Sequence, residues 1–175
     1  MKNEKNPFLL NLGSLLSQPI GSYQEFPFEI EQVQFTDDFA LAAFEGTLTV
    51  SRTTQGLVAQ GNFEGELTLQ CARCLKDYAH LLEWEITELY AFDPNEATDD
   101  DLLLPNNAKV DIKPILADEA QLNVPINPIC KEDCQGLCQI CGTDLNLGDC
   151  EHKDIPPEDE RENPNSPFSG LKDLL

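Results

Sequence analysis

ICKEDCQGLCQICGTDLNLGDCEH, the stretch from residue 129 to residue 152, holds five of the chain's seven cysteines and one of its two histidines. The other two cysteines lie in LQCARCL, residues 69–75. Thiolates a few residues apart can converge on one tetrahedral Zn²⁺, because a short turn brings both sulfurs to the same side. The spacing predicts four pairs of metal ligands, which are Cys71 with Cys74, Cys130 with Cys134, Cys138 with Cys141, and Cys150 with His152.

The pair in CQICG, residues 138–142, is the most specific of the four. A C-x-x-C-G sequence is typical of a zinc-knuckle turn, in which the glycine accepts a positive φ. Two arrangements of the ligands are open. In one, the four cysteines between residues 130 and 141 hold a single zinc and the other groups are accessory. In the other, two zincs bind, and Cys71 and Cys74 join a pair from the tail. We therefore expect one or two Zn²⁺ per chain.

The composition limits the class of partner. The chain has 175 residues, of which 41% are hydrophobic, and this is enough for a folded core. The formal net charge of −21 repels phosphate backbones and attracts basic partners or cations. It argues against non-specific nucleic-acid binding, which requires clusters of Lys and Arg.

The first residues and the apolar segments indicate a cytoplasmic protein. Polar residues interrupt the apolar run in MKNEKNPFLLNLGSLLSQ, residues 1–18, so this segment does not have the pattern of a signal peptide. No apolar segment approaches the length of a membrane span, and we expect no membrane association. Thiols stay reduced in the cytosol, which favours metal ligands over disulfides for the clustered cysteines.

Residues from about Glu25 to Phe92 alternate apolar and polar side chains and are rich in β-branched and aromatic types. Four strands are expected, over residues 25–33, 41–51, 56–71 and 78–92. In the last of them, one face carries Tyr78, His80, Leu82, Trp84, Ile86 and Tyr90 at a two-residue period. The predicted fold is mainly β (α+β), an antiparallel meander curled into a sandwich or small barrel. A helix and a zinc-binding, cysteine-rich C-terminal segment complete it.

The remaining segments set the expected organisation of the chain. Helical spacing predicts a short helix over residues 7–17 and a helix of three turns after Pro114, ended by Pro125. The acidic residues 93–109 are expected to form a mobile loop. The predicted parts are an N-terminal helical segment (1–20), a β-rich domain (21–125), a zinc-binding cluster (126–152) and an acidic linker with a short apolar tag (153–175).

The sequence does not predict an enzyme. It contains no Ser/His/Asp grouping and no glycine-rich phosphate loop, so no catalytic residue is proposed. Cysteine-rich zinc sites with four protein ligands are mostly structural. A thiol-disulfide oxidoreductase using Cys71 and Cys74 is an alternative, although redox pairs normally sit at a helix N-terminus and here the flanks are predicted strands.

Several motifs in one order carry a resemblance to a known family. CARCL in mid-chain is followed by LNVPINPIC, then by QGLCQICGTDLN, and the chain ends in LKDLL. This order resembles the YceD family, the large ribosomal RNA subunit accumulation proteins of bacteria and plastids. The resemblance runs from about Phe26 to the C-terminus and is densest between Val124 and Cys150. Family members with the complete tail usually end it with C-x-C, where this chain has Cys150-Glu151-His152.

The resemblance implies a non-enzymatic factor for biogenesis of the large ribosomal subunit, which promotes accumulation or processing of its ribosomal RNA. The implied partners are the large ribosomal subunit precursor and a basic ribosomal protein, with ribosomal RNA as a further candidate. A strongly acidic domain suits the holding of a basic protein. The alternative is a direct RNA-binding zinc protein, which would have to use the positive spot formed by Arg73 and Lys76.

Overall fold

The chain forms two compact units. The computed structural model describes residues 6–95, 97, 98 and 102–152. Of these, residues 6–69 and 78–126 belong to the first unit, and residues 70–77 and 127–152 belong to the second. The acidic linker and apolar tag expected at residues 153–175 lie outside the described residues.

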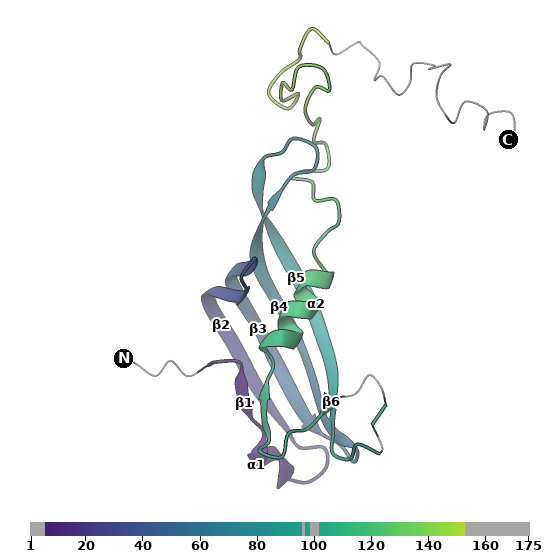
Figure 1. The fold of residues 1–175 in the computed structure, drawn as a ribbon. Helices are drawn as coiled ribbons and strands as arrows, with labels where there is room; N and C mark the ends of the chain where they lie inside the picture. The colour runs from purple at the N-terminus through teal and green to yellow at the C-terminus, as the bar shows by residue number, and fades with distance from the viewer. Residues whose placement is uncertain (1–5, 96, 99–101, 153–175) are drawn as a thin grey trace, which may run out of the picture. The chain divides into compact units, whose positions relative to one another are not determined.

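A five-stranded sheet forms most of the first unit (Figure 1). Its strands, in spatial order, are β2 (Tyr23–Thr36), β3 (Phe39–Arg52), β4 (Gly56–Gln70), β5 (Asp77–Ala91) and β6 (Leu102–Leu103). β2 and β4 both run antiparallel to β3, whereas β6 runs parallel to β5. All four strands predicted by alternation are present, and the mainly β meander is confirmed.

The expected closure of the meander is not confirmed. In the described part of the chain, no strand pairing joins the two edge strands β2 and β6, so the sheet stays open and no barrel forms. The small second sheet contains only β1 (Leu9–Asn11) and β7 (Lys109–Asp111), and it does not establish a sandwich. A layer packed on one face buries the apolar side chains of the large sheet, so burial does not require closure.

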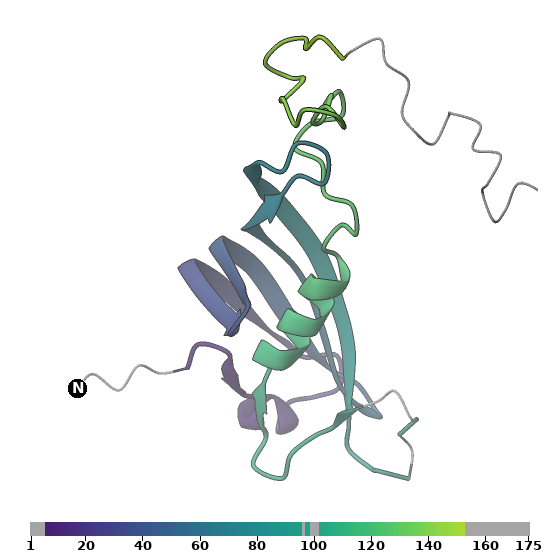
Figure 2. The ribbon, with the colours of Figure 1, turned by 45° about the horizontal axis from the view of Figure 1, so that its top comes forward.

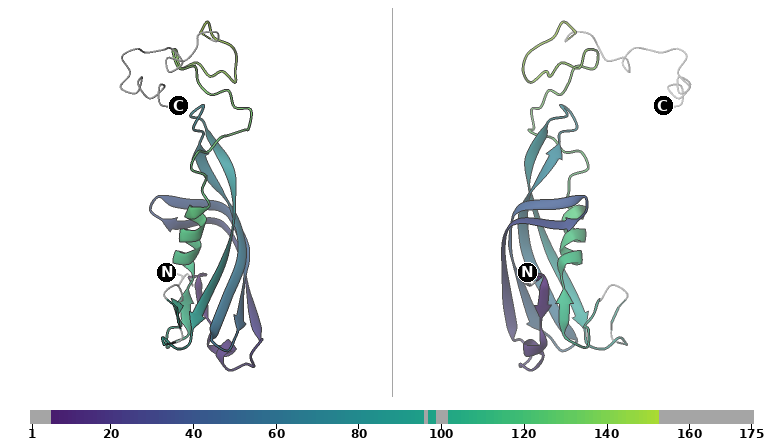
Figure 3. Two further views of the ribbon diagram at one scale, coloured as in Figure 1. Left: turned by 90° about the vertical axis from the view of Figure 1, so that its right-hand side faces the viewer. Right: turned by 60° about the vertical axis from the view of Figure 1, so that its left-hand side comes forward.

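That layer consists of β1, β7, α1 (Gly13–Leu16) and α2 (Lys113–Leu122). Figure 2 and Figure 3 show α2 lying along one face of the five-stranded sheet. Leu12, which lies between β1 and α1, and Leu116 from α2 belong to the same buried core as the sheet residue Phe44. No helix in the described ranges is long and apolar enough to cross a membrane.

Aromatic side chains hold the two layers together. The ring of Phe44 on β3 is fully buried, and its centroid lies 6.0 Å from that of Phe8 and 5.9 Å from that of Trp84. Such tilted pairs add about 0.5–1.5 kcal/mol each beyond the burial of their area. Trp84 and Ile86 are buried on the face of β5 that alternation predicted to be apolar.

The helix expected before Pro125 is confirmed as α2. The carboxylate of Asp111 accepts a hydrogen bond from the Lys113 N–H at 3.0 Å, and Pro114 occupies the first turn, where its missing N–H leaves no bond unmade. The small residues Ala117 and Ala120 are buried and allow close packing on the sheet.

Two sequence predictions are corrected by strand pairing. The helix expected over residues 7–17 is reduced to the four residues of α1, because Leu9–Asn11 pairs with Lys109–Asp111 and forms β1. The loop expected over residues 93–109 contains β6, which pairs with β5 through Leu102 and Leu103. Backbone pairing with a distant segment overrides a local pattern in both places.

We expect that Gly46→Ala destabilises the first unit by about 1–3 kcal/mol, because a Cβ at this position overpacks the sheet. It would lie 2.3 Å from Cδ1 of Phe63 and 2.6 Å from the carbonyl oxygen of Asn62, and the backbone contact is not relieved by a rotamer change. Denaturant unfolding measures the effect. The control is Gly148→Ala, which meets open space; equal stability of the two variants would contradict the prediction.

Candidate metal centres

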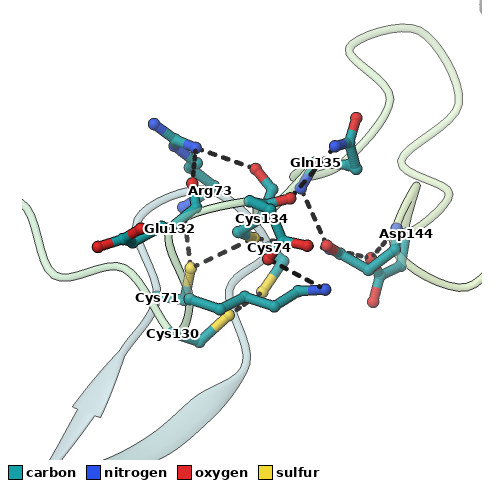
Figure 4. Close-up of polar contacts among 11 residues, drawn as sticks. Cys71, Arg73, Cys74, Cys130, Glu132, Cys134, Gln135 and Asp144 are labelled. Atoms are coloured by element: carbon teal, nitrogen blue, oxygen red, sulfur yellow. Dashed lines mark hydrogen bonds and ion pairs between the residues drawn. The ribbon is translucent and has the colours of Figure 1, made fainter.

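The first group of sulfurs comes from two distant parts of the chain. The ligand atoms of Cys71, Cys74, Cys130 and Cys134 all lie within 4.8 Å of one another. The Cys71 Sγ lies 3.8 Å from the Cys134 Sγ, and the Cys74 Sγ lies 3.7 Å from the Cys130 Sγ (Figure 4). A tetrahedral Zn²⁺ with Zn–S bonds of about 2.3 Å places its sulfurs about 3.8 Å apart, so the spacing fits this ion.

A tight turn between β4 and β5 positions the first two sulfurs. The N–H of Cys71 donates to the carbonyl of Lys76 at 2.9 Å, and the N–H of Leu75 donates to the carbonyl of Cys71 at 2.9 Å. Leu75 closes the turn with a φ of 58°, an unusual value for a residue with a side chain. The N–H of Ala72 donates to the carbonyl of Pro128 at 2.7 Å and joins the turn to the segment with the other two sulfurs.

Hydrogen-bond donors surround the sulfurs of this first group. The Arg73 N–H donates to the Cys71 Sγ at 3.4 Å, and Nδ2 of Asn146 donates to the Cys134 Sγ at 3.6 Å. The backbone N–H of Cys74 is the main cause that lowers the pKa of Cys71 to about 6, with further donors from Cys130 and Arg73. These donors stabilise a thiolate, which is the form that binds a metal.

The four thiols do not ionise equally. Burial, together with the neighbouring thiols, raises the pKa of Cys130 to about 12. Negative charges collected in one buried place oppose each other, so all four groups become thiolates only with a compensating cation. The donor set therefore fits a thiophilic divalent metal.

The second group lies entirely within the cysteine-rich stretch. It contains Cys138, Cys141, Cys150 and His152, whose ligand atoms also lie within 4.8 Å of one another. Gly142 has a φ of 72° and donates its N–H to the carbonyl of Cys138 at 2.8 Å, which is the turn expected from C-x-x-C-G. This set of three sulfurs and one ring nitrogen is typical of zinc sites.

Two polar features support a metal in the second group. The hydroxyl of Thr143 lies 3.2 Å from the Cys141 Sγ and is the main cause that lowers the pKa of Cys141 to about 6. Nδ1 of His152 is buried and has no hydrogen-bond partner in the described part of the chain. A buried ring nitrogen without a partner is costly, and a metal ion would satisfy it.

The two groups differ in burial. In the first group Cys71, Cys74 and Cys134 are buried and Cys130 is half-buried. In the second group the Cys141 side chain is exposed, and only Cys138 is buried. The grouping corresponds to the two-zinc arrangement, since Cys130 and Cys134 lie with the mid-chain pair and not with Cys138.

Both cations beside the mid-chain cysteines are engaged within the second unit. The guanidinium of Arg73 donates to the carbonyl oxygen of Cys134 at 3.0 Å and to that of Glu132 at 3.4 Å. The Lys76 ammonium lies 2.5 Å from a carboxylate oxygen of Asp144 and holds the pKa of that carboxyl at about 2. Both side chains therefore have partners within the unit, and both remain exposed.

Sequence reasoning missed the residues that support the ligands. Asn146, Thr143 and Asp144 all lie in TDLN, directly after the zinc-knuckle turn. Short polar side chains of these types often form hydrogen bonds to the backbone of turns, and this composition was the one sign in the sequence that they support a turn. Nothing in the sequence connected Asn146 to the sulfur of Cys134, or Asp144 to Lys76.

Comparison with known proteins gives one family. The family model described as large ribosomal RNA subunit accumulation protein YceD matches residues 59–175, about two thirds of the chain. An uncharacterized protein of Mycobacterium tuberculosis (strain H37Rv) is 31% identical over 103 residues, which cover 56% of this chain and 49% of that protein. The uncharacterized protein YlbN of Bacillus subtilis is 28% identical over 113 residues, 63% of this chain and 62% of its own length. The chain thus spans about half to two thirds of the length of these relatives, and no solved structure matches it.

We expect that Lys76→Met loosens the second unit, because Asp144 then loses the cation that it faces and stays largely shielded from solvent. Amide hydrogen exchange should become faster in residues 127–147. Lys131→Met is the matched control, since Lys131 lies 3.6 Å from an exposed Asp133. The same change in exchange for both variants would contradict a specific role of the Lys76–Asp144 pair.

Proposed function

The chain belongs to the YceD family, the large ribosomal RNA subunit accumulation proteins, and we propose on this basis that it is a non-enzymatic factor for biogenesis of the large ribosomal subunit. It promotes accumulation or processing of the large-subunit ribosomal RNA and acts in the cytoplasm. The family match over residues 59–175 is the observation that carries this proposal.

The factor acts through contacts with basic ribosomal proteins or precursor particles. The described part of the first unit contains only three basic residues, Arg52, Lys109 and Lys113, whereas its strands carry many exposed glutamates. Such a surface attracts cationic proteins and speeds their encounter. Direct RNA binding is the weaker candidate, because Arg73 and Lys76 are held by partners within the second unit.

The metal is Zn²⁺, with one ion in each group of four ligands. Thiolate and imidazole ligands in tetrahedral sets suit zinc, and four protein ligands leave no open position for catalysis. Zinc would supply a cross-link between residues 70–77 and the segment after residue 127. A structural zinc contributes on the order of 10 kcal/mol of apparent binding free energy in small domains. The role of the metal is therefore structural.

Two zinc ions per chain are expected by elemental analysis of the purified full-length protein. Asn146→Asp keeps the side-chain oxygen that accepts from the Gln135 N–H but replaces the amide that donates to the Cys134 Sγ. Loss of such a supporting donor should weaken zinc affinity by about 10–100-fold, measured by chelator competition. Asn127→Asp, at an exposed position, makes the same charge change and should have little effect. One zinc per chain would contradict the two-centre proposal. Equal losses of zinc affinity in both variants would contradict a specific role of the Asn146 amide.

Sedimentation of cell extract through a low-salt gradient tests the function. The protein should migrate with immature large subunits, together with a basic ribosomal protein. Association should weaken as ionic strength rises, because salt screens charge attraction between surfaces. Migration as a free small protein at every salt concentration would reject the proposed role. Recovery of the protein on naked ribosomal RNA, independent of any protein, would favour direct RNA binding instead.

A further inference from the structure

The two groups of ligands differ in how far solvent reaches their sulfurs. In the first group Cys71 is 0% exposed, and Cys74 and Cys134 are each 4% exposed. In the second group the Cys141 side chain is exposed and Cys150 is half-buried. Peroxides react with thiolates, and a thiolate that solvent reaches reacts first. The second group therefore contains the sulfur of the chain that is most open to oxidation.

A partner for that sulfur lies in the same turn. The Cys138 N–H donates to the carbonyl of Thr143, and the Cys138 carbonyl accepts from the Gly142 N–H, both at 2.8 Å. These two bonds close a tight turn, and the Sγ atoms of Cys138 and Cys141 lie within 4.8 Å of each other. A disulfide requires about 2.05 Å between its sulfurs, and rotation of two side chains within one turn can close such a gap.

The first group has no comparable pair. Cys71 and Cys74 also share a turn, but both side chains are buried. Cys130 is half-buried and is the most accessible thiol of this group. The Sγ atom that lies 3.7 Å from the Cys130 Sγ belongs to the buried Cys74. Exposure and shared turn thus coincide only in the pair of Cys138 and Cys141.

We propose that Cys141 is an oxidation site, at which a peroxide leads to a disulfide between Cys141 and Cys138. The Cys141 thiolate attacks one oxygen of hydrogen peroxide, the O–O bond breaks, and a sulfenic acid forms as hydroxide departs. The Cys138 thiolate then attacks the oxidised sulfur, and a second hydroxide leaves. Each hydroxide takes up a proton. Two thiolates, one hydrogen peroxide and two protons give one disulfide and two waters.

The disulfide removes two of the four ligands of the second group, because its sulfurs are no longer thiolates. Cys150 and His152 remain, and two ligands do not complete a tetrahedral site. This consequence rests on the zinc ions of the proposed function. The first group keeps its four ligands, and the Asn146 amide still donates to the Cys134 Sγ at 3.6 Å. Oxidation therefore opens one centre and leaves the other intact.

The test treats the full-length, zinc-loaded protein with hydrogen peroxide. Free thiols are then blocked with iodoacetamide, and each cysteine is assigned as free or oxidised by peptide mass spectrometry. Zinc that leaves the protein is measured with a colorimetric chelator. We expect a Cys138–Cys141 disulfide and the loss of one of the two zinc ions. Dithiothreitol with added zinc should restore the starting state, because exposed disulfides are readily reduced.

Two results would overturn the proposal. One is a disulfide within the first group, between Cys74 and either Cys71 or Cys130, that forms before the one in the second group. The other is a Cys141 thiol that is still alkylated when other cysteines are already oxidised. Both results are read from the wild-type protein, so the test does not depend on the folding of a variant.

A matched pair of variants tests the choice of sulfurs. Cys141→His keeps a zinc ligand and removes the exposed sulfur, whereas Cys150→His makes the same replacement and leaves the Cys138–Cys141 pair in place. At a peroxide dose that removes one zinc from the wild-type protein, Cys141→His should keep both zinc ions. Cys150→His should lose one of them. Equal protection or equal loss in the two variants would contradict the assignment of the pair.

Zinc content before oxidation and the map of oxidised cysteines separate this inference from the proposed function. If two zinc ions are bound and Cys138 and Cys141 stay reduced in peroxide, the two centres stand and the oxidation site fails. If the Cys138–Cys141 disulfide forms in a protein that binds fewer zinc ions, the oxidation site stands and the two-centre proposal fails.

Discussion

The order of the second unit depends on the convergence of four sulfurs, two from the turn at residues 71–74 and two from residues 130–134. This part of the chain has almost no apolar core. Cys134 and Cys138 are its only buried apolar residues in the described range after residue 127, while Ile140 and Leu147 are exposed. Backbone hydrogen bonds, such as the one from the Ala72 N–H to the Pro128 carbonyl, orient the segments but bury little apolar area. A metal ion held by these sulfurs would take the place that hydrophobic burial has in an ordinary domain.

The sheet could be predicted from the sequence because its signal is local. Alternation along each strand reports which side chains face the core. On the predicted face of β5, Leu82, Trp84, Ile86 and Tyr90 are buried, whereas Tyr78 and His80 are only half-buried. The errors occurred where a distant partner decides the structure. Leu9–Asn11 has the spacing of a helix and forms β1 only because Lys109–Asp111 offers its backbone, about a hundred residues later. A single sequence carries no sign of that pairing.

The grouping of the metal ligands also depends on contacts between distant segments, which the sequence does not predict. Spacing identifies residues that can share a turn, and the glycine after Cys141 predicted the positive φ that Gly142 adopts. Spacing does not say which turns meet. Cys130 and Cys134 are closer in sequence to Cys138 than to Cys71, yet they meet the mid-chain pair, because the turn between β4 and β5 presents its sulfurs and its backbone to them.

Charge has two different uses in this chain, and net charge alone does not separate them. In the second unit, Lys76 forms an ion pair with Asp144, and Arg73 donates a hydrogen bond to the carbonyl oxygen of Cys134. In the first unit the glutamates of the open face oppose one another without compensation. Surface pairs of opposite sign contribute little to stability, and directly opposed like charges subtract from it. Folding therefore explains the placement of the cations and does not explain why Glu29, Glu45 and Glu64 lie directly opposite one another.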